Sequence, residues 1–349
     1  MAVTVRSLLA LAATLLACAC ATPLGGSPMG AALPSHPALL PPSGTIHDGA
    51  DAVRVLRSGE STFTELRLLI DGARQSVDVE VYEFGRTDLA AAVVAAHRRG
   101  VAVTVIDDRS ESQTAGTVAG LRAQGVDVVD YPIRARMIDH VKLLLVDARV
   151  AVVGGINWGV ASSANHDFDV ELHGPVVANL QRVFARDLVT CGRLQPVPPV
   201  TPDAAVLVAT TLPGSEVLPL VLGVLDSSRR TLDVAMYTLT DADAVAAIEA
   251  AHDRGVAVRV LLDPSERPSD PSAASLRAHG VPVRLYRSSG ELLHAKVAIA
   301  DGSSVVLGSA NWTFSGFEHN HELDVALPGA PAIAAAFVAQ FDSDWSASA

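Results

Sequence analysis

Lysine is almost absent from this chain of 349 residues, which has only two lysines among its 26 lysine and arginine residues. Arginine carries nearly all of the positive charge. Lysine offers a compact ammonium group on a flexible stem, whereas arginine offers a broad planar fork. We therefore expect Lys142 and Lys296 to serve a tight pocket rather than a basic surface patch.

Cysteine is also scarce, with three in the whole chain. Cys18 and Cys20 lie in the first 21 residues, which leaves Cys191 alone in the remainder. An intramolecular disulfide is therefore excluded there, and stability must come from the apolar core. No Cys/His cluster has the spacing of a zinc site and no glycine-rich phosphate loop is present, so we expect neither a metal nor a cofactor.

Positive charge is in deficit, since the formal net charge is −12. Nonspecific nucleic-acid binding rests mainly on contacts of basic side chains with phosphates, so this balance argues mildly against a nuclease. A local basic groove within an acidic total leaves that class open. Long apolar runs are missing beyond the N-terminal leader, so no later segment is long enough to span a membrane.

The leader predicts export. Arg6 precedes an apolar run over residues 8–17, and small residues follow. This order is typical of a secretory signal peptide over residues 1–21. Residues 15–18 also fit a lipoprotein signal that ends before Cys18, which would then be the lipid anchor. We expect an exported protein, either secreted or periplasmic, or a lipoprotein attached to the membrane.

One pattern of polar residues occurs twice. His, Lys and Asp stand in the frame H-x-K-x4-D, and Gly, a small residue and Asn follow at fixed distances. Each lysine begins an apolar run that predicts a buried strand, and His and Lys two residues apart share a strand face. The two sets are His140, Lys142, Asp147, Gly154, Gly155 and Asn157, and His294, Lys296, Asp301, Gly308, Ser309 and Asn311.

The repeat extends over the whole chain after the leader. The stretch from Val77 to Tyr82 matches that from Leu232 to Tyr237, and similar pairs follow. Strands and helices alternate in each copy, which predicts an α/β fold with largely parallel strands. Composition predicts a flexible tether over residues 22–45, a first half over 46–194, a proline-rich linker over 195–205 and a second half over 206–349. We expect one compact, monomeric body.

The doubled frame resembles the two "HKD" motifs of the phospholipase D superfamily. The resemblance covers the region from about Ser43 to the C-terminus. It implies two α/β/α sandwich halves related by a pseudo-twofold axis, with one active site between them. It also implies cleavage of a phosphodiester without a metal, through a phosphohistidine intermediate.

The resemblance assigns roles to the repeated residues. His140 is the expected nucleophile, and His294 is the expected acid that protonates the leaving oxygen. Lys142, Lys296, Asn157 and Asn311 would bind the phosphate oxygens. Asp147 and Asp301 are expected to hold turns, with Gly154, Gly155, Gly308 and Ser309 as structural positions of the motif.

An acid that orients each histidine is expected after each motif, at Asp167 and Glu322. The family usually has Glu at this point, so the shorter Asp167 puts the symmetry of the two half-sites in doubt. Tyr82 and Tyr237 are expected to fill the core rather than line the cleft.

We therefore expect an exported phospholipase D-type phosphodiesterase that hydrolyses phospholipids or transfers their phosphatidyl group, with peripheral contact to membranes. A nuclease of the same superfamily that takes nucleic acid as its substrate is the alternative. A cardiolipin synthase-like phosphatidyltransferase and a noncatalytic binding protein are less favoured readings. The loops beside the motifs, including Arg134 and Arg136, do not identify the substrate.

Overall fold

The computed structural model describes residues 40–134, 136–287 and 290–349. The predicted signal peptide, the anchor at Cys18 and most of the predicted tether therefore lie outside the described residues. All described residues belong to one compact unit. None of the helices within them is long and apolar enough to cross a membrane.

The first sheet has eight strands in the order β1-β2-β8-β7-β6-β3-β4-β5. Its inner strands β6 and β7 carry the first motif and are almost wholly buried. The strands are β1 (Ile46–Asp48), β2 (Asp51–Leu56), β3 (Ser76–Val81), β4 (Ala102–Asp107), β5 (Asp127–Asp130), β6 (Lys142–Val146), β7 (Val150–Gly154) and β8 (Asp169–His173).

The second sheet repeats this order in seven strands, β12-β11-β10-β13-β14-β15-β9. Strands β13 and β14 carry the second motif. The strands are β9 (Leu207–Thr210), β10 (Thr231–Met236), β11 (Ala257–Leu262), β12 (Val283–Leu285), β13 (Lys296–Ala300), β14 (Ser304–Gly308) and β15 (Leu323–Leu327).

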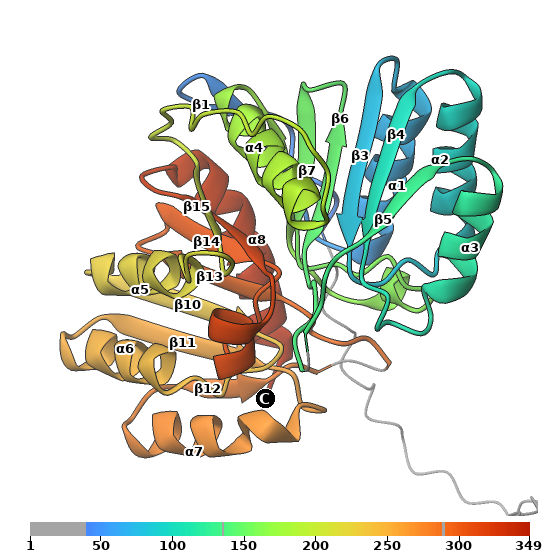
Figure 1. Ribbon diagram of the computed structural model, residues 1–349. Coiled ribbons are helices and arrows are strands. Elements are labelled where there is room, and N and C mark those ends of the chain that lie inside the picture. The colour runs from blue at the N-terminus through green and yellow to red at the C-terminus, as the bar shows by residue number, and fades with distance from the viewer. Residues whose placement is uncertain (1–39, 135, 288–289) are drawn as a thin grey trace, which may run out of the picture. The chain divides into compact units, whose positions relative to one another are not determined.

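The helices form two outer layers and contribute to a shared centre (Figure 1). Helices α1 (Gly59–Gly72), α2 (Thr87–Arg98) and α3 (Ala115–Ala123) pack one face of the first sheet through a single apolar cluster. Helices α5 (Val217–Ser227), α6 (Ala242–Asp253) and α7 (Asp270–Ala278) do the same for the second sheet.

A third apolar cluster joins the halves. It contains Leu143 and Val297 from the two motif strands, and side chains of α4 (Pro175–Thr190) and α8 (Pro331–Ala347). Both of these helices have proline in their first turn, where its missing N–H costs nothing. Burial of apolar surface in this common cluster holds the halves as one body.

The predicted fold class is confirmed, since both halves are mixed α/β sheets with the same strand order. The expectation of largely parallel strands is wrong. Only β3, β4 and β5, and their counterparts β10, β11 and β12, pair in parallel. Each motif hairpin has a connection too short for a crossover, which forces antiparallel pairing. The domain boundaries stay predictions.

Candidate active site

The two motif histidines lie just before β6 and β13 and are nearly buried. The side chain of His140 is 8% exposed and that of His294 is 7% exposed. Each ring contacts a tyrosine from the neighbouring strand end. The ring centroids are 5.2 Å apart for Tyr82 and His140, and 4.8 Å apart for Tyr237 and His294. Of the two positions open to Tyr82 and Tyr237, core or cleft, these contacts favour the cleft over the core that we expected.

The acids that face the histidines come from opposite halves. Glu322 of the second half lies 2.8 Å from Nδ1 of His140 in the first half. Asp167 of the first half lies 2.9 Å and 3.2 Å, by its two oxygens, from Nδ1 of His294 in the second half. The shorter aspartate thus reaches its histidine. Both acids contact Nδ1, so Nε2 is the nitrogen that faces the chemistry, although Nε2 of His294 also lies 3.0 Å from Nζ of Lys296.

Short parallel β-bridges between the halves set up this exchange. The N–H of His140 donates to the carbonyl of His321, and the N–H of His294 donates to the carbonyl of His166, both at 2.8 Å. The bridges pair Asp139 with His321 and Leu293 with His166, so each joins the residue before a motif histidine to the residue before the other half's acid. The main chain alone places each carboxylate beside the opposite ring.

Burial dominates the electrostatics of the histidines. It lowers the pKa of His140 to about 4, although Glu322 partly opposes this and Lys142 adds to it. The pKa of His294 is also lowered by burial, against the attraction of Asp167. Without bound phosphate both rings are therefore neutral near pH 7, and an anionic ligand would raise both pKa values.

The acids stay ionised. Burial alone would raise the pKa of Glu322, but His140, Lys142 and the hydroxyl of Ser309 together lower it to about 2. Burial opposes the same effect at Asp167, where His294 and Lys296 lower the pKa. An ionised carboxylate on Nδ1 keeps that nitrogen protonated and fixes the ring, as a nucleophilic or acid-base histidine requires.

The two lysines lie behind the histidines in a tight pocket, as their scarcity suggested. Nζ of Lys142 donates to the carbonyl of His140 at 2.5 Å, and Nζ of Lys296 donates to the carbonyl of His294 at 2.6 Å. Burial lowers the pKa of Lys142 to about 7 and that of Lys296 to about 8. Two buried ammonium groups this close are costly unless an anion joins them.

The asparagines of the motifs carry unused hydrogen-bonding capacity. Oδ1 of Asn157 and Oδ1 of Asn311 are both buried without a hydrogen-bond partner. The tryptophans that follow them, Trp158 and Trp312, are buried beneath and bridge to the strand ends at Phe84 and Leu239. Hydrogen bonds join the histidines, the lysines and their acids, whereas the contacts of the two asparagines with them stay predictions. The roles of all six residues predicted to be catalytic stay predictions.

The first glycine of each motif makes room for a carboxylate. A Cβ built on Gly154 would lie 2.1 Å from Oδ1 of Asp169, and one on Gly308 would lie 2.1 Å from Oδ1 of Asp324. These carboxylates accept hydrogen bonds from the N–H groups of Ile156 and Ala310, which shape the loop before each asparagine. Any side chain at these glycines would displace the loop.

The next motif position differs between the halves, with glycine in the half whose acid is Asp167 and serine in the half whose acid is Glu322. Ser309 donates from Oγ to Glu322 Oε2 at 2.6 Å and accepts from the N–H of Leu323. At Gly155 a Cβ would lie 2.6 Å from Oδ1 of Asp167. The long acid has a serine beside it and the short acid has a glycine, because the shorter side chain brings its carboxylate closer to the main chain.

The motif aspartates lie at the opposite ends of β6 and β13 from the histidines. Asp147 accepts hydrogen bonds from the N–H groups of residues 74–76, and Asp301 accepts from those of residues 229–231, at 2.6–3.1 Å. Both have positive φ, 53° and 56°. They fasten the motif hairpin to the start of the neighbouring strand and contact neither histidine.

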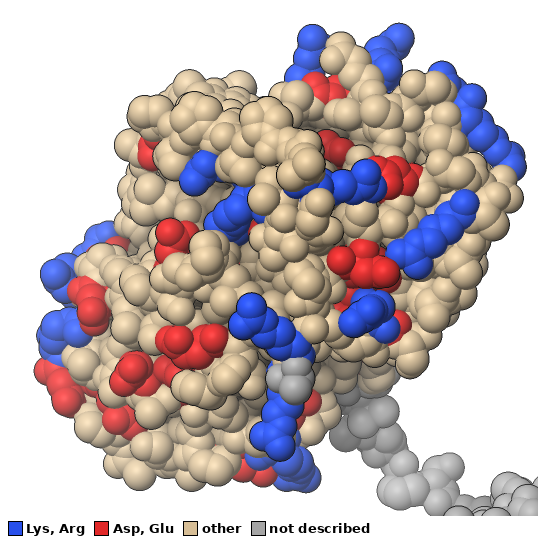
Figure 2. Space-filling model, in the orientation of Figure 1, with Lys and Arg blue, Asp and Glu red and all other residues tan. Residues whose placement is uncertain are grey.

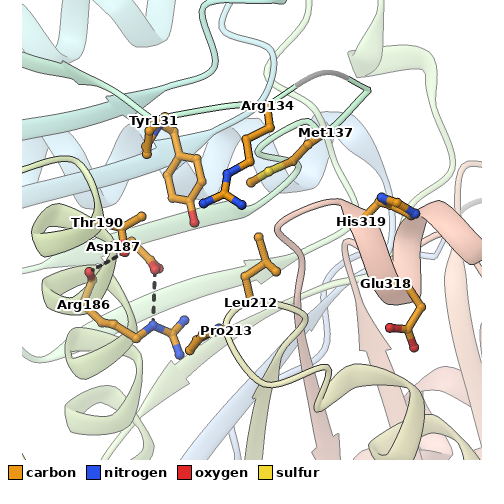
Figure 3. A pocket seen from close by; sticks show the side chains of 11 residues that line it. Tyr131, Arg134, Met137, Arg186, Asp187, Thr190, Leu212, Pro213, Glu318 and His319 are labelled. Atoms are coloured by element: carbon orange, nitrogen blue, oxygen red, sulfur yellow. Dashed lines mark hydrogen bonds and ion pairs between the residues drawn. The ribbon is translucent and has the colours of Figure 1, made fainter.

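A pocket of about 780 Å³ opens near the first motif (Figure 3). Arg134 and Met137 from the loop before His140 line it, together with Tyr131 and with Leu212 and Pro213 from the second half. On the face in Figure 2, acidic and basic side chains are interspersed over a mostly uncharged surface. The pocket combines apolar walls with both basic and acidic side chains, since Arg186, Asp187 and Glu318 also line it.

A family model described as "Cardiolipin synthase, PLD-like domain" matches residues 66–188 and 221–345. This chain belongs to the phospholipase D superfamily. The comparison therefore identifies an enzyme of this superfamily and confirms the resemblance drawn from the doubled motif.

Relatives and solved structures agree with this assignment. Cardiolipin synthase A of Pseudomonas putida strain GB-1 is 30% identical over 310 residues, which cover 78% of this chain and 64% of the relative. The chain thus spans just under two thirds of that relative. Phosphatidylserine synthase of Haemophilus influenzae has the same fold, with a TM-score of 0.65 at 12% identity over 84% of this chain and 85% of that one.

A second solved structure shows how widely the fold is used. Polyphosphate kinase of Porphyromonas gingivalis aligns with a TM-score of 0.58 at 15% identity, over 83% of this chain and 46% of its own. Fold similarity at such identities therefore does not define a reaction.

The comparisons overturn two expectations. The curated relatives are named as synthases, so our leading expectation of a hydrolase is wrong. The expectation of an exported protein, either secreted or a lipoprotein, is also wrong, because the relatives are named for cardiolipin synthesis and none as a secreted protein. Nothing in these relatives supports a nucleic-acid substrate, an anchor at Cys18 or a monomeric state.

Proposed function

We propose that this protein is a phosphatidyltransferase of the cardiolipin synthase type, which moves a phosphatidyl group from one phospholipid to a hydroxyl of another. The carrying observation is the crossed arrangement of Glu322 with His140 and of Asp167 with His294. It supplies two oriented imidazoles in one site. The likeness to the synthases, over 78% of the chain, favours a lipid alcohol as the acceptor.

The first step uses one histidine as nucleophile and the other as acid. Nε2 of His140 attacks phosphorus while Nδ1–H remains bonded to Glu322. The bound phosphodiester anion raises the pKa of His294, whose ring then carries a proton on Nε2 as well as on Nδ1. The bond from phosphorus to the headgroup oxygen breaks, and that oxygen takes this Nε2 proton. The products of this step are a phosphatidyl group on His140 and a free alcohol.

The second step reverses the roles with a new alcohol. His294 Nε2, now neutral, takes the proton from a primary hydroxyl of an acceptor such as phosphatidylglycerol. The hydroxyl oxygen attacks phosphorus and His140 leaves, so that a new phosphodiester forms and both histidines return to their starting state. Lys142, Lys296 and the Nδ2 groups of the asparagines can donate to the phosphate oxygens as negative charge develops.

The test uses the purified full chain with vesicles of phosphatidylglycerol, and it measures cardiolipin by mass spectrometry and free glycerol enzymatically. We expect one glycerol released for each cardiolipin formed. His140→Ala and His294→Ala should each lose activity by about a thousandfold or more, because residues that act as one unit fail together. His279→Ala, with its ring 37% exposed on the second half, is the matched control.

Two results would contradict the proposal. Phosphatidic acid as the only phosphorus-containing product would mean that water, not a lipid, takes the phosphatidyl group. Cardiolipin formation that survives either histidine substitution would rule out the shared site. The intermediate itself is testable with ³²P-labelled donor, since His294→Asn should slow its breakdown and leave label on the protein.

A further inference from the structure

A second buried polar cluster lies where the two halves meet, separate from the pair His140 and His294. Glu80 of β3, Asp187 of α4 and His321 are fully buried, with at most 1% of each residue exposed. One ligand atom from each lies within 4.8 Å of those of the other two. Nε2 of His321 is 3.1 Å from Asp187 Oδ2 and 3.8 Å from Glu80 Oε1.

The cluster has unsatisfied acceptors. Both carboxylate oxygens of Glu80 are buried without a hydrogen-bond partner, and so is Oδ2 of the nearby Asp139. Burial, and then Asp187 and Asp139, raise the pKa of Glu80 well above its usual value. Arg186 pairs with Asp187 Oδ1, 3.3 Å away, on the solvent side. Among the described residues, the cluster therefore holds more carboxylates than cations.

The equivalent position on the other side of the pseudo-twofold axis has its hydrogen bonds satisfied. There His166 of the first half lies 2.6 Å from Asp344 of the second half and also bonds the carbonyl of Arg57, while Gln340 donates to the other oxygen of Asp344. Ala235 stands at the position of Glu80 in the paired strand. The His166–Asp344 pair therefore has only neutral hydrogen-bond partners. The equivalent His321–Asp187 pair has a further carboxylate, Glu80, beside it.

We propose that Glu80, Asp187 and His321 bind a divalent transition-metal ion of the Zn²⁺ or Mn²⁺ type. One imidazole nitrogen with two or three carboxylates is a common ligand set for these ions, with bonds of about 2.0–2.2 Å for Zn²⁺. Ligand atoms within 4.8 Å of one another need only a small contraction to meet around one ion. A dication would offset the excess of buried carboxylate charge.

An entry route and a consequence follow from the surroundings. Asp187 lines the 780 Å³ pocket, where it lies beside Tyr131 and Arg186 (Figure 3). The ring of His321 stacks on Tyr131 with centroids 5.0 Å apart. The main chain of His321 bonds to both Ile138 and His140. Glu322, the acid that contacts His140, follows His321 in the sequence. An ion bound to His321 would therefore help to fix the position of Glu322 without entering the active site.

The experiment strips the untagged full chain with a chelator, adds Zn²⁺ or Mn²⁺, removes free metal by dialysis and counts bound ions by mass spectrometry. We expect one ion per chain and a Tm several degrees higher, because an ion that binds only the folded state stabilises it by mass action. Glu80→Gln keeps the shape but should lose the ion and the Tm gain. Asp78→Asn, two residues away on β3, is the matched control and should keep both.

Two outcomes overturn the proposal. The first is no metal retained by the wild-type chain after dialysis, which would mean that a shared proton on Glu80 satisfies the cluster. The second is the same stoichiometry in Glu80→Gln and in Asp187→Asn as in the wild type. Metal counting and Tm need no phospholipid, so failure here is distinct from failure of the proposed transferase activity.

Discussion

Asp167 lies 2.9 Å from Nδ1 of His294, although 127 residues of sequence separate them and they belong to different halves of the duplication. The counterpart, Glu322 on His140, closes the pair in the opposite direction. Each half therefore supplies one motif histidine and the carboxylate that contacts the other half's histidine. This exchange makes specific expectations for single substitutions.

Neutralising either acid should slow the reaction while leaving substrate binding nearly intact. Glu322→Gln and Asp167→Asn keep the shape but lose the charge that holds the histidine tautomer, so we expect kcat to fall by about 10²- to 10⁴-fold with little change in KM. Steady-state kinetics on phosphatidylglycerol vesicles measure this. Glu60→Gln, an exposed acid on α1, is the control. A rise in KM of similar size with kcat unchanged would assign these acids to substrate binding instead.

Gly155 beside Asp167 should not tolerate serine, whereas Ser309 beside Glu322 should tolerate glycine better. Gly155→Ser places a side chain where Asp167 Oδ1 lies, 2.6 Å from the new Cβ, and should displace the carboxylate from His294. We expect a loss of at least about tenfold in kcat, consistent with disturbing a group that orients a catalytic residue. Ser309→Gly removes one hydrogen bond to Glu322 and should cost less. Equal activities for the two variants would contradict the size-matching described above.

A buried lysine should be a burden on stability. Lys142→Met keeps the length of the side chain and removes an ammonium group whose burial lowers its pKa to about 7. We expect activity to be lost and stability at pH 7 to rise by about 1–4 kcal/mol, because a lysine whose pKa is lower in the folded than in the unfolded chain destabilises the fold at this pH. Denaturant unfolding measures the change. If the variant were less stable than the wild type, the buried charge of Glu322 would be compensated mainly by Lys142 and not by His140.

Activity and lysine-dependent stability should respond to alkali in opposite directions. The pKa values of about 7 for Lys142 and about 8 for Lys296 mean that charge on the phosphate-binding groups disappears as pH rises through this window. We expect kcat/KM to fall between pH 7 and 9. The unfolded chain binds protons on these lysines up to about pH 10.4, so their contribution to stability rises with pH over the same range. Activity unchanged up to pH 10 would contradict the assignment.

The motif aspartates should matter for stability and not for the chemical step. Asp301→Ala leaves the N–H groups of residues 229–231 without their carboxylate, and we expect a loss of about 1–2 kcal/mol in the free energy of unfolding, with kcat nearly unchanged at a permissive temperature. Burial would raise the pKa of Asp301, but the backbone N–H groups lower it overall, so its stabilisation is present above about pH 4 and fades in stronger acid. A large fall in kcat without loss of stability would reverse this view.

The fold class could be predicted from the sequence because short-range patterns encode it, and the same patterns predict the six motif side chains. Lys142 opens an apolar strand and His140 shares its face, which periodicity alone predicts. The antiparallel pairing of each motif strand was missed because alternation of elements was weighed above the short connection after Asp147. The contact of Tyr82 with His140 was missed because one aromatic residue at a strand end fits core and cleft equally well.

The exchange of acids between halves was beyond any local pattern. Asp167 and Glu322 follow their own motifs in the sequence, and only the packing of one half on the other decides which ring each meets. One signal was available and unused. Gly155 and Ser309 differ at one motif position, as do Asp167 and Glu322 at another, so that the size of the neighbour tracks the length of the acid.

The main-chain hydrogen bonds from His140 to His321, and from His294 to His166, make the two copies depend on each other. Neither copy, if released by a cut in the connector, would hold a complete catalytic pair, yet each would present an unpaired strand end that fits the other. Fragments made separately should thus regain function only on mixing. A substitution in one copy must preserve the contacts that this copy makes with the other copy. Each half therefore constrains which residues the other half can accept.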